Sequence, residues 1–277
     1  MPVVGTSADF GGPSLGTGAP WAVVEHHATI GSTNARAAEI GEPWCVVVAD
    51  HQSAGRGRMT RKWTAPPGTS MAVSVTVPLP QAHIGWVPLL AGLAVAEAIE
   101  SSAFLRADLK WPNDVLLPAD GGGKVCGVLG EVLSEHHLAV VGAGINVSQH
   151  REQLPVETAT SLALAGATRV DRSSLLQAYL SRFAFWYASL GRAKPGSGWS
   201  EPGEASVTAS TDLTHLREAY RSRCVTIGQQ VRLTRPHDSD LIGDAVAVDD
   251  DGRLVIETKV GRSAWAAGDV THVRARG

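Results

Sequence analysis

Apolar residues along the first half of the chain mostly follow the spacing of β-strands. Alternating or β-branched runs predict strands at residues 21–27, 45–49, 71–77, 108–111, 115–117, 125–133 and 138–146. A run rich in Leu and Ala at 87–101 predicts a buried helix, and apolar residues at three- and four-residue steps predict an amphipathic helix at 171–190. A short helix at 34–40 is expected, because Ser32 or Thr33 can cap its start and Gly41 and Pro43 end it.

The spacing of apolar residues changes to two from Cys224 onward. Short strands are predicted at 231–234, 241–248, 254–258 and 263–266, with a tight turn at 249–252. A loop at 193–205 and a short helix near 213–221 precede this region. The pattern therefore predicts an α+β body followed by an all-β domain, with a flexible tail at 1–20, a catalytic domain at 21–222 and a C-terminal domain at 223–277.

Composition excludes several classes of protein. The 277 residues are 44% hydrophobic and 18% charged with a net charge of −3, which argues against disorder, a nucleic-acid coat protein and a polybasic membrane binder. Cys45, Cys126 and Cys224 lie far apart, so neither a disulfide framework nor a zinc site is expected. The longest apolar stretch, at 87–99, contains Glu97 and is shorter than the roughly 20 residues of a membrane span. A cytoplasmic location is the simplest expectation.

A basic loop at residues 55–63, with the sequence GRGRMTRKW, is the most unusual local feature. It carries four cations and no acid, and apolar strands flank it. A solvated turn and an Arg-Gly segment for RNA are the alternatives. Its position at the edge of a sheet favours an anion site, because glycines allow close approach and arginines bind phosphate or carboxylate oxygens. Mutual repulsion of the arginines predicts a mobile loop without ligand.

Three further segments carry residues that are candidates for binding or catalysis. KWPNDV at 110–115 offers Asn113 and Asp114 as oxygen ligands of the kind that Mg²⁺ prefers, although an Asn-Asp hairpin turn explains the same pattern. KVCGVLGE at 124–131 places Lys124 at the start of an apolar strand, either as a functional group or as an edge residue. Glycines within this strand, and within GAGIN at 142–146, indicate close packing against the backbone.

In this order, the four segments resemble the signature motifs of the biotin protein ligase family. The segments STN at 32–34 and DHQ at 50–52 resemble the family as well. The likeness covers about residues 26–190, and the tail at 224–277, with its AGDV, resembles the family's SH3-like C-terminal domain. One departure is Thr60, which stands where the family loop has glycine. The resemblance implies a mixed or antiparallel sheet with flanking helices, followed by a small SH3-like β-barrel.

The resemblance also implies a reaction: ATP and biotin give biotinoyl-5′-AMP, and the biotinoyl group then passes to a lysine of a biotin carboxyl carrier protein. The implied biotin-binding residues are Ser32, Thr33, Gln52, Gly55, Arg56, Lys124, Gly127, Gly142 and Ile145. The implied ATP-binding residues are Arg58, Arg61, Trp63, Lys110, Asn113 and Asn146. Lys124, Arg58 and Asp114 are the implied catalytic residues, Asp114 acting either as a base or as an orienting group, and Asn113 is the implied ligand of Mg²⁺.

Other functions remain open from the sequence. A lipoate or octanoate ligase has a similar fold, but the GRGR and KWPND segments argue against it. A biotin-sensing DNA-binding regulator needs an N-terminal helix-turn-helix domain, and only about 20 residues precede the first expected strand. The β-rich tail is also compatible with a nucleic-acid or peptide-binding module. We expect a stand-alone ligase, monomeric or weakly dimeric, that binds neither specific DNA nor membranes.

Overall fold

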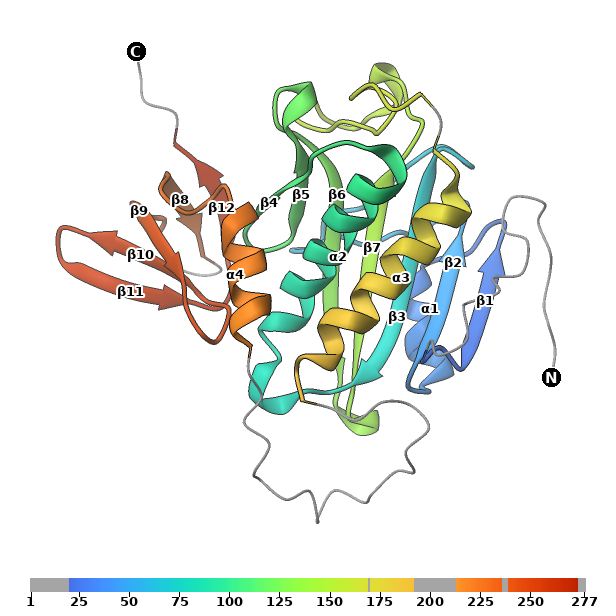
Figure 1. Ribbon diagram of the computed structural model, residues 1–277, viewed down its shortest axis with the longest axis horizontal. Coiled ribbons are helices and arrows are strands. Elements are labelled where there is room, and N and C mark those ends of the chain that lie inside the picture. Colours follow the sequence, from blue (N-terminus) through green and yellow to red (C-terminus); the bar gives the residue numbers. More distant parts are fainter. Residues whose placement is uncertain (1–19, 169, 192–212, 236–238, 274–277) are drawn as a thin grey trace.

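The first part of the chain forms a seven-stranded sheet with helices on both faces (Figure 1). The computed structural model describes residues 20–168, 170–191, 213–235 and 239–273. Across the sheet the strand order is β1-β2-β3-β7-β6-β5-β4, with β1 and β2 parallel and every other neighbouring pair antiparallel. In chain order the strands are β1 (Val23–His27), β2 (Cys45–Ala49), β3 (Ser70–Pro78), β4 (Asp108–Lys110), β5 (Asp114–Leu117), β6 (Gly123–Leu133) and β7 (Leu138–Asn146). The predicted mixed sheet is confirmed.

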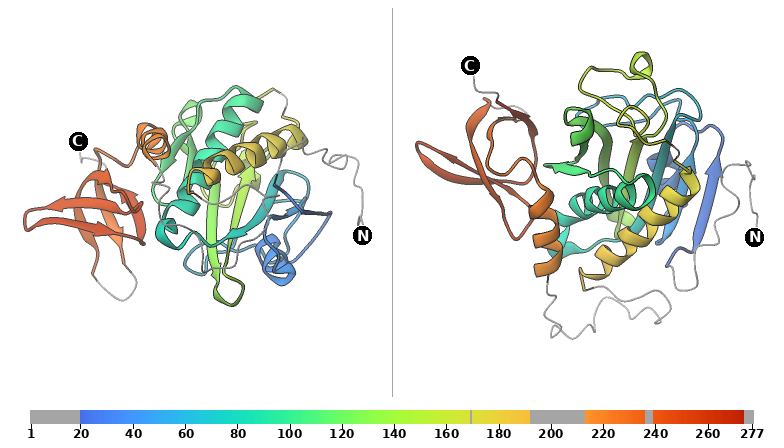
Figure 2. Two further views of the ribbon diagram at one scale, coloured as in Figure 1. Left: turned by 60° about the horizontal axis from the view of Figure 1, so that its bottom comes forward. Right: turned by 45° about the horizontal axis from the view of Figure 1, so that its top comes forward.

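Two layers of helix cover opposite faces of this sheet. The long helices α2 (Trp86–Ala103) and α3 (Arg172–Ala188) pack on one face, and α1 (Thr33–Ile40) lies on the other (Figure 2). The alternation of β2 shows this division, because Val46 and Val48 join the main core while Val47 packs against Ala37 of α1. The side with α1 is the thinner layer and leaves part of the sheet uncovered by helix.

The helix ends follow the capping residues that the sequence offered. Ser32 is the N-cap of α1, where its Oγ accepts from the amide of Ala35, and Gly41 ends the helix with a φ of +65°. Asp171 caps α3 by accepting from the amides of Ser173 and Ser174. The predicted start and end of α1 are confirmed.

Helix α2 is the central helix of the main core. Its 18 residues have a mean hydropathy of 1.2, so it is longer than the sequence predicted and, by length and composition alone, sufficient to cross a membrane. However, 72% of this segment is buried within the protein, as in a core helix. Its carboxylate Glu97 accepts from Arg182 Nε at 2.5 Å and from Trp186 Nε1 at 2.8 Å, which ties α2 to α3.

A second, five-stranded antiparallel sheet follows helix α4 (Thr214–Arg223), with strand order β11-β10-β9-β8-β12. It lies beside the β4 edge of the first sheet (Figures 1 and 2). Its strands are β8 (Gln230–Thr234), β9 (Leu241–Val248), β10 (Leu254–Thr258), β11 (Gly261–Trp265) and β12 (Asp269–His272). The sequence predicted the first four and missed β12, whose four residues DVTH bury only Val270.

Two sequence predictions fall on other parts of the chain. The expected N-terminal tail lies almost entirely outside the described residues, and so does the loop expected at 193–205. The three cysteines are described, and all are buried with free thiols.

Candidate functional site

A cavity of about 540 Å³ opens on the α1 face of the sheet, next to the edge of the C-terminal sheet. All four sequence segments contribute to its lining. Of the expected site residues, those that line it are Ser32, Thr33, Gln52, Arg56, Arg58, Arg61, Trp63, Lys110, Asn113, Asp114, Lys124, Gly127, Gly142 and Asn146. The structure therefore brings together fourteen of the sixteen, from segments far apart in the sequence.

Two expected biotin-binding residues do not line the cavity. Ile145 is fully buried in the main core, because alternation along β7 points its side chain toward the opposite face from Gly144 and Asn146. Gly55 is at the base of the basic loop, where its carbonyl accepts from the amide of Trp63 at 2.9 Å. A Cβ at Gly55 would lie 2.5 Å from the carbonyl oxygen of Trp63, so this glycine permits the loop to close.

Glycines on β6 and β7 make the floor of the cavity. A Cβ at Gly144 would lie 2.5 Å from Cε2 of Trp63, so the indole ring lies directly against the β7 backbone. A Cβ at Gly142 would lie 2.0 Å from Oδ1 of Asn34, in α1. Other side chains therefore occupy the space that these two residues leave free. The close packing that the sequence predicted is confirmed at both positions.

The basic loop folds as a small hairpin. Its two sides are joined at Arg56 and Lys62, and the amide of Gly57 donates to the carbonyl of Arg61 at 2.7 Å. Met59 and Thr60 form the tip with φ values of +53° and +61°. Thr60 thus adopts the left-handed conformation that a glycine takes without cost, and this is unusual for a β-branched residue.

Two arginines of the loop reach the far walls of the cavity. Arg58 donates to Oδ1 of Asn113 and to the carbonyl of Gly268, each at 3.2 Å, and its burial lowers the pKa of the guanidinium below the ordinary value. Arg61 forms an ion pair with Asp269 at the start of β12. The C-terminal sheet therefore holds the loop from outside, and these contacts offset the repulsion that the sequence analysis expected.

Arg56 points to a different partner, the carboxylate of Glu131 on β6. Its Nη2 lies 2.9 Å from Oε2 of Glu131, and the same oxygen accepts from Nδ2 of Asn34 at 2.7 Å. Asn34 also donates to the carbonyl of Leu129, and its Oδ1 lies 2.6 Å from Oγ of Ser74. Glu131 and Asn34 thus fix Arg56 beside the floor.

The network continues to the expected biotin-binding residues of α1. Oγ of Ser74 lies 2.7 Å from Oγ1 of Thr33, whose amide donates to Oε1 of Gln52 at 2.8 Å. Asn34 and Glu131 belong to the sequence motifs, but no role was predicted for them. Ser74 lies outside the motifs and was not predicted. The available signal for Ser74 was a polar residue within the otherwise apolar run of β3.

Lys124 and Asp114 form a close ion pair in the site. Nζ of Lys124 lies 2.6 Å from Oδ1 of Asp114, on the neighbouring strand β5. A Cβ at Gly127 would lie 3.1 Å from the same Nζ, so the absence of a side chain there lets the lysine lie over its own strand. An ammonium group is thereby fixed at the floor of the cavity.

The segment at 155–160 forms the wall next to Lys124. The amide of Lys124 donates to the carbonyl of Thr158 at 2.8 Å, and its own carbonyl accepts from the amide of Thr160. Asn146 supports this wall, because its Nδ2 donates to the carbonyl of Thr160 at 2.8 Å while its Oδ1 accepts from Gln149. Both ends of the Asn146 amide are thus bonded to protein.

The residues present do not fit a resident magnesium site. The expected ligand Asn113 has its Oδ1 bonded to Arg58 and its Nδ2 donating to the carbonyl of Val128 at 2.9 Å. Asp114 is paired with Lys124, and no group of three or more His, Cys, Asp or Glu side chains that could hold a metal occurs among the described residues. A magnesium role for Asn113 finds no support in this geometry.

Comparison with known proteins places this site in a family. The sequence profile of the Biotin/lipoate A/B protein ligase family matches residues 29–146, and that of the Biotin protein ligase C terminal domain matches residues 226–273. A biotin–[acetyl-CoA-carboxylase] ligase of Mycobacterium tuberculosis is 34% identical over 271 residues, which cover 94% of this chain and 92% of the relative. The chain belongs to the biotin protein ligase family.

A structural relative and a second curated relative agree. The Aquifex aeolicus biotin protein ligase in complex with biotin and ATP superposes with a TM-score of 0.70, at 26% identity, covering 91% of this chain and 99% of that one. The bifunctional ligase/repressor BirA of Bacillus subtilis is 30% identical over 257 residues, 88% of this chain and 72% of the relative. The family includes the two-domain arrangement seen here, so the predicted family and fold are confirmed.

The network around Asn34 gives a first testable prediction. Asn34→Ala removes two donors and one acceptor from a buried group of polar atoms, and it leaves the Leu129 carbonyl without this partner. We expect the free energy of unfolding to fall by about 1–3 kcal/mol, measured by urea denaturation. Ser53→Ala, at an exposed hydroxyl, is the control and should change it by less than about 0.5 kcal/mol. Equal stabilities for the two variants would contradict the assigned network.

Proposed function

We propose that this chain is an ATP-dependent biotin protein ligase that activates biotin as biotinoyl-5′-AMP and transfers it to a lysine of a biotin carboxyl carrier protein. The observation that supports this most is the cavity, in which all four family motifs meet over a floor of glycines. The named relative from Mycobacterium tuberculosis and the Aquifex aeolicus complex with biotin and ATP support the same substrates.

The first step needs positive charge, because both reactants are anions. A carboxylate oxygen of biotin attacks the α-phosphorus of ATP, a new P–O bond forms, and the bond to the bridging oxygen breaks so that pyrophosphate leaves. Lys124, Arg58 and Arg61 are placed around one cavity and are suited to stabilise the negative charge that develops on the α-phosphate. Mg²⁺ that arrives with the phosphates of ATP would add charge neutralisation without a protein cage.

Different residues that line the cavity suit the two halves of the intermediate. Ser32, Thr33 and Gln52 offer hydroxyl, amide and carbonyl groups to the ureido ring of biotin, beside Gly127 and Gly142. Trp63 and Lys110 are assigned to the nucleotide, and Asn146 serves it by supporting the wall at 155–160. The ion pair with Glu131 orients Arg56. Arg56 can therefore contact the ligand only if it breaks this ion pair or binds the ligand and Glu131 at the same time.

The second step transfers the biotinoyl group. The amine of the carrier lysine attacks the carbonyl carbon, an amide forms, and AMP leaves. Two roles for Asp114 stay open: it accepts the proton of the incoming amine, or it orients Lys124 at 2.6 Å. Asp114→Asn separates them, since loss of a base slows transfer alone, whereas loss of the orienting group slows adenylation as well.

Biotin and lipoate supplied separately with ATP test the function. We expect biotin, and not lipoate, to cause release of pyrophosphate from the purified protein. Addition of a biotin carboxyl carrier domain should then give biotinylated carrier, detected by mass. Release of pyrophosphate with lipoate alone would assign the chain to the other branch of the superfamily.

Lys124→Ala should lower the rate of adenylation by about 10²-fold or more, the usual effect of losing one preorganised charged group. Biotin-dependent pyrophosphate release measures this rate. Lys259→Ala, at an exposed lysine in the turn between β10 and β11, is the control and should leave the rate unchanged. A wild-type rate in Lys124→Ala would mean that Lys124 is only an edge residue of the sheet.

Arg58→Gly should affect retention of the intermediate more than its formation. The change removes the contacts of the loop with Asn113 and Gly268 and adds backbone freedom, so the loop closes less tightly over the adenylate. We expect continued pyrophosphate release and escape of biotinoyl-AMP, seen as biotin on bystander serum albumin. Arg262→Gly, at an exposed arginine of β11, is the matched control. Albumin labelling no higher than with wild type would refute the retention role.

A further inference from the structure

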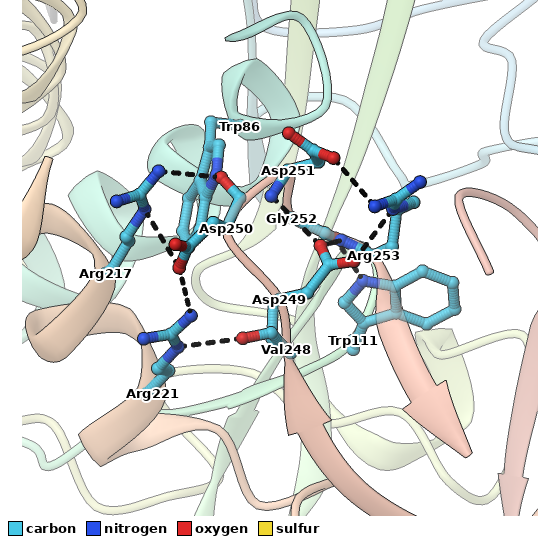
Figure 3. Close-up of polar contacts among 10 residues, drawn as sticks. All are labelled: Trp86, Trp111, Arg217, Arg221, Val248, Asp249, Asp250, Asp251, Gly252 and Arg253. Atoms are coloured by element: carbon cyan, nitrogen blue, oxygen red, sulfur yellow. Dashed lines mark hydrogen bonds and ion pairs between the residues drawn. The ribbon is translucent and has the colours of Figure 1, made fainter. Parts of the chain in front are cut away.

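The turn between β9 and β10 is inserted into the first domain (Figure 3). The carbonyl of Asp250 accepts from Nε1 of Trp86 at 2.8 Å, and the carbonyl of Gly252 accepts from Nε1 of Trp111 at 3.0 Å. Both indole rings are at most 1% exposed. A buried N–H group without an acceptor lowers the stability of the folded state. The turn therefore stabilises the core of the first domain by supplying acceptors for these two indole N–H groups.

Two glycines allow this close contact. Gly85 precedes α2, and a Cβ there would lie 2.4 Å from the carbonyl oxygen of Asp251. Gly252 has a φ of +81°, and a Cβ on it would lie 3.0 Å from Cδ1 of Leu89. The two backbones therefore meet where neither domain has a side chain in the way.

Helix α4 holds the turn from its other side. Nη2 of Arg221 lies 3.0 Å from Oδ1 of Asp250, and Nε of the same arginine donates to the carbonyl of Val248 at 2.8 Å. Arg217 donates to the carbonyl of Asp250 at 3.0 Å (Figure 3). Asp249 shapes the turn itself by accepting from the amides of Asp251 and Arg253.

This turn connects with the cavity in two ways. Trp111, which it holds, is followed directly by Pro112, Asn113 and Asp114 of the cavity wall. The same sheet also carries Gly268 and Asp269, because β12 pairs with β8 and β8 pairs with β9. Fixing the β9–β10 turn therefore fixes the position from which the sheet holds Arg58 and Arg61.

We propose that the turn Asp249–Gly252 is a positioning element for the reaction: it places the C-terminal sheet so that Gly268 and Asp269 hold the basic loop closed over the adenylate. This proposal rests on the proposed function. Displacing the turn should leave the pocket for biotin intact and loosen only the closure of the loop.

Gly85→Ala tests the proposal by adding one methyl group against the turn. Gly92→Ala is the matched control, because it adds the same group within α2, the helix that Gly85 precedes, and meets only Cδ2 of Leu109 at 3.7 Å. Each protein is incubated with ATP and labelled biotin, freed from excess substrate, and followed for loss of bound biotinoyl-AMP. We expect Gly85→Ala to lose it on the order of tenfold faster than wild type, and Gly92→Ala at the wild-type rate.

A second measurement separates positioning from general damage. Biotin affinity without ATP should change by less than about twofold in Gly85→Ala, because the turn is bonded to Trp86, Trp111, Arg217 and Arg221, none of which is assigned to biotin. The double variant Gly85→Ala/Asp269→Asn should lose the adenylate no faster than the faster single variant, since both release the same closure.

Several outcomes would overturn the proposal. These are a wild-type rate of adenylate loss in Gly85→Ala, equal losses in Gly85→Ala and Gly92→Ala, or multiplied effects in the double variant. Should Gly85→Ala fail to fold, Asp249→Ala loosens the turn without a clash and carries the same expectations. Wild-type protein that forms no biotinoyl-AMP would instead refute the proposed function, so the two failures are distinguishable.

Discussion

Glycines on one face of β6 and β7 determine where the other residues of the site lie. Along β7, every second side chain points toward α2 and α3 and belongs to the main core. The residues between them point to the opposite face, and there glycines leave the backbone uncovered. Trp63, Asn34 and Lys124 occupy the space over Gly144, Gly142 and Gly127 respectively. A side chain at any of these positions would displace the residue above it, so the cavity depends on backbone exposure within a sheet that is otherwise densely packed.

Three cations that line this cavity are paired with carboxylates before any ligand binds. Glu131 holds Arg56, Asp114 holds Lys124, and Asp269 holds Arg61. These acids limit the repulsion among the basic groups and orient them toward one region. An anionic ligand must therefore replace existing ion pairs. Its binding free energy is the difference between the contacts it makes and the ion pairs it replaces. This arrangement favours selectivity for ligands with several well-placed anionic oxygens over simple anions.

The strands followed from local patterns, whereas the expected site residues followed from the resemblance of four motifs to a known family. Strand β7 was predicted at both ends, and the motif glycines were correctly expected to mark close packing. Ile145 was assigned by its place in a motif, although the period of two already places it opposite Gly144 and Asn146. The remaining omissions are nonlocal: Arg61 and Asp269 lie 208 positions apart, and Asn34 and Glu131 lie 97 apart. No local spacing encodes such pairs, because they arise only when the sheet order brings two segments together.

The C-terminal domain is joined to the first domain at several points, which explains how so small a domain can hold the basic loop. Besides the contacts at Asp269 and at the β9–β10 turn, the amide of Val225 donates to the carbonyl of Leu109 at 2.9 Å, and Oγ1 of Thr226 accepts from the amide of Trp111 at 3.0 Å. Contact at Asp269 alone would let the sheet pivot with the loop and resist nothing, since an exposed ion pair contributes little. The β9–β10 turn supplies a further attachment, and its partners Trp86 and Trp111 are buried donors that bind backbone carbonyls. Because these contacts do not depend on charge, they keep the sheet in place when an anionic ligand competes for Arg61.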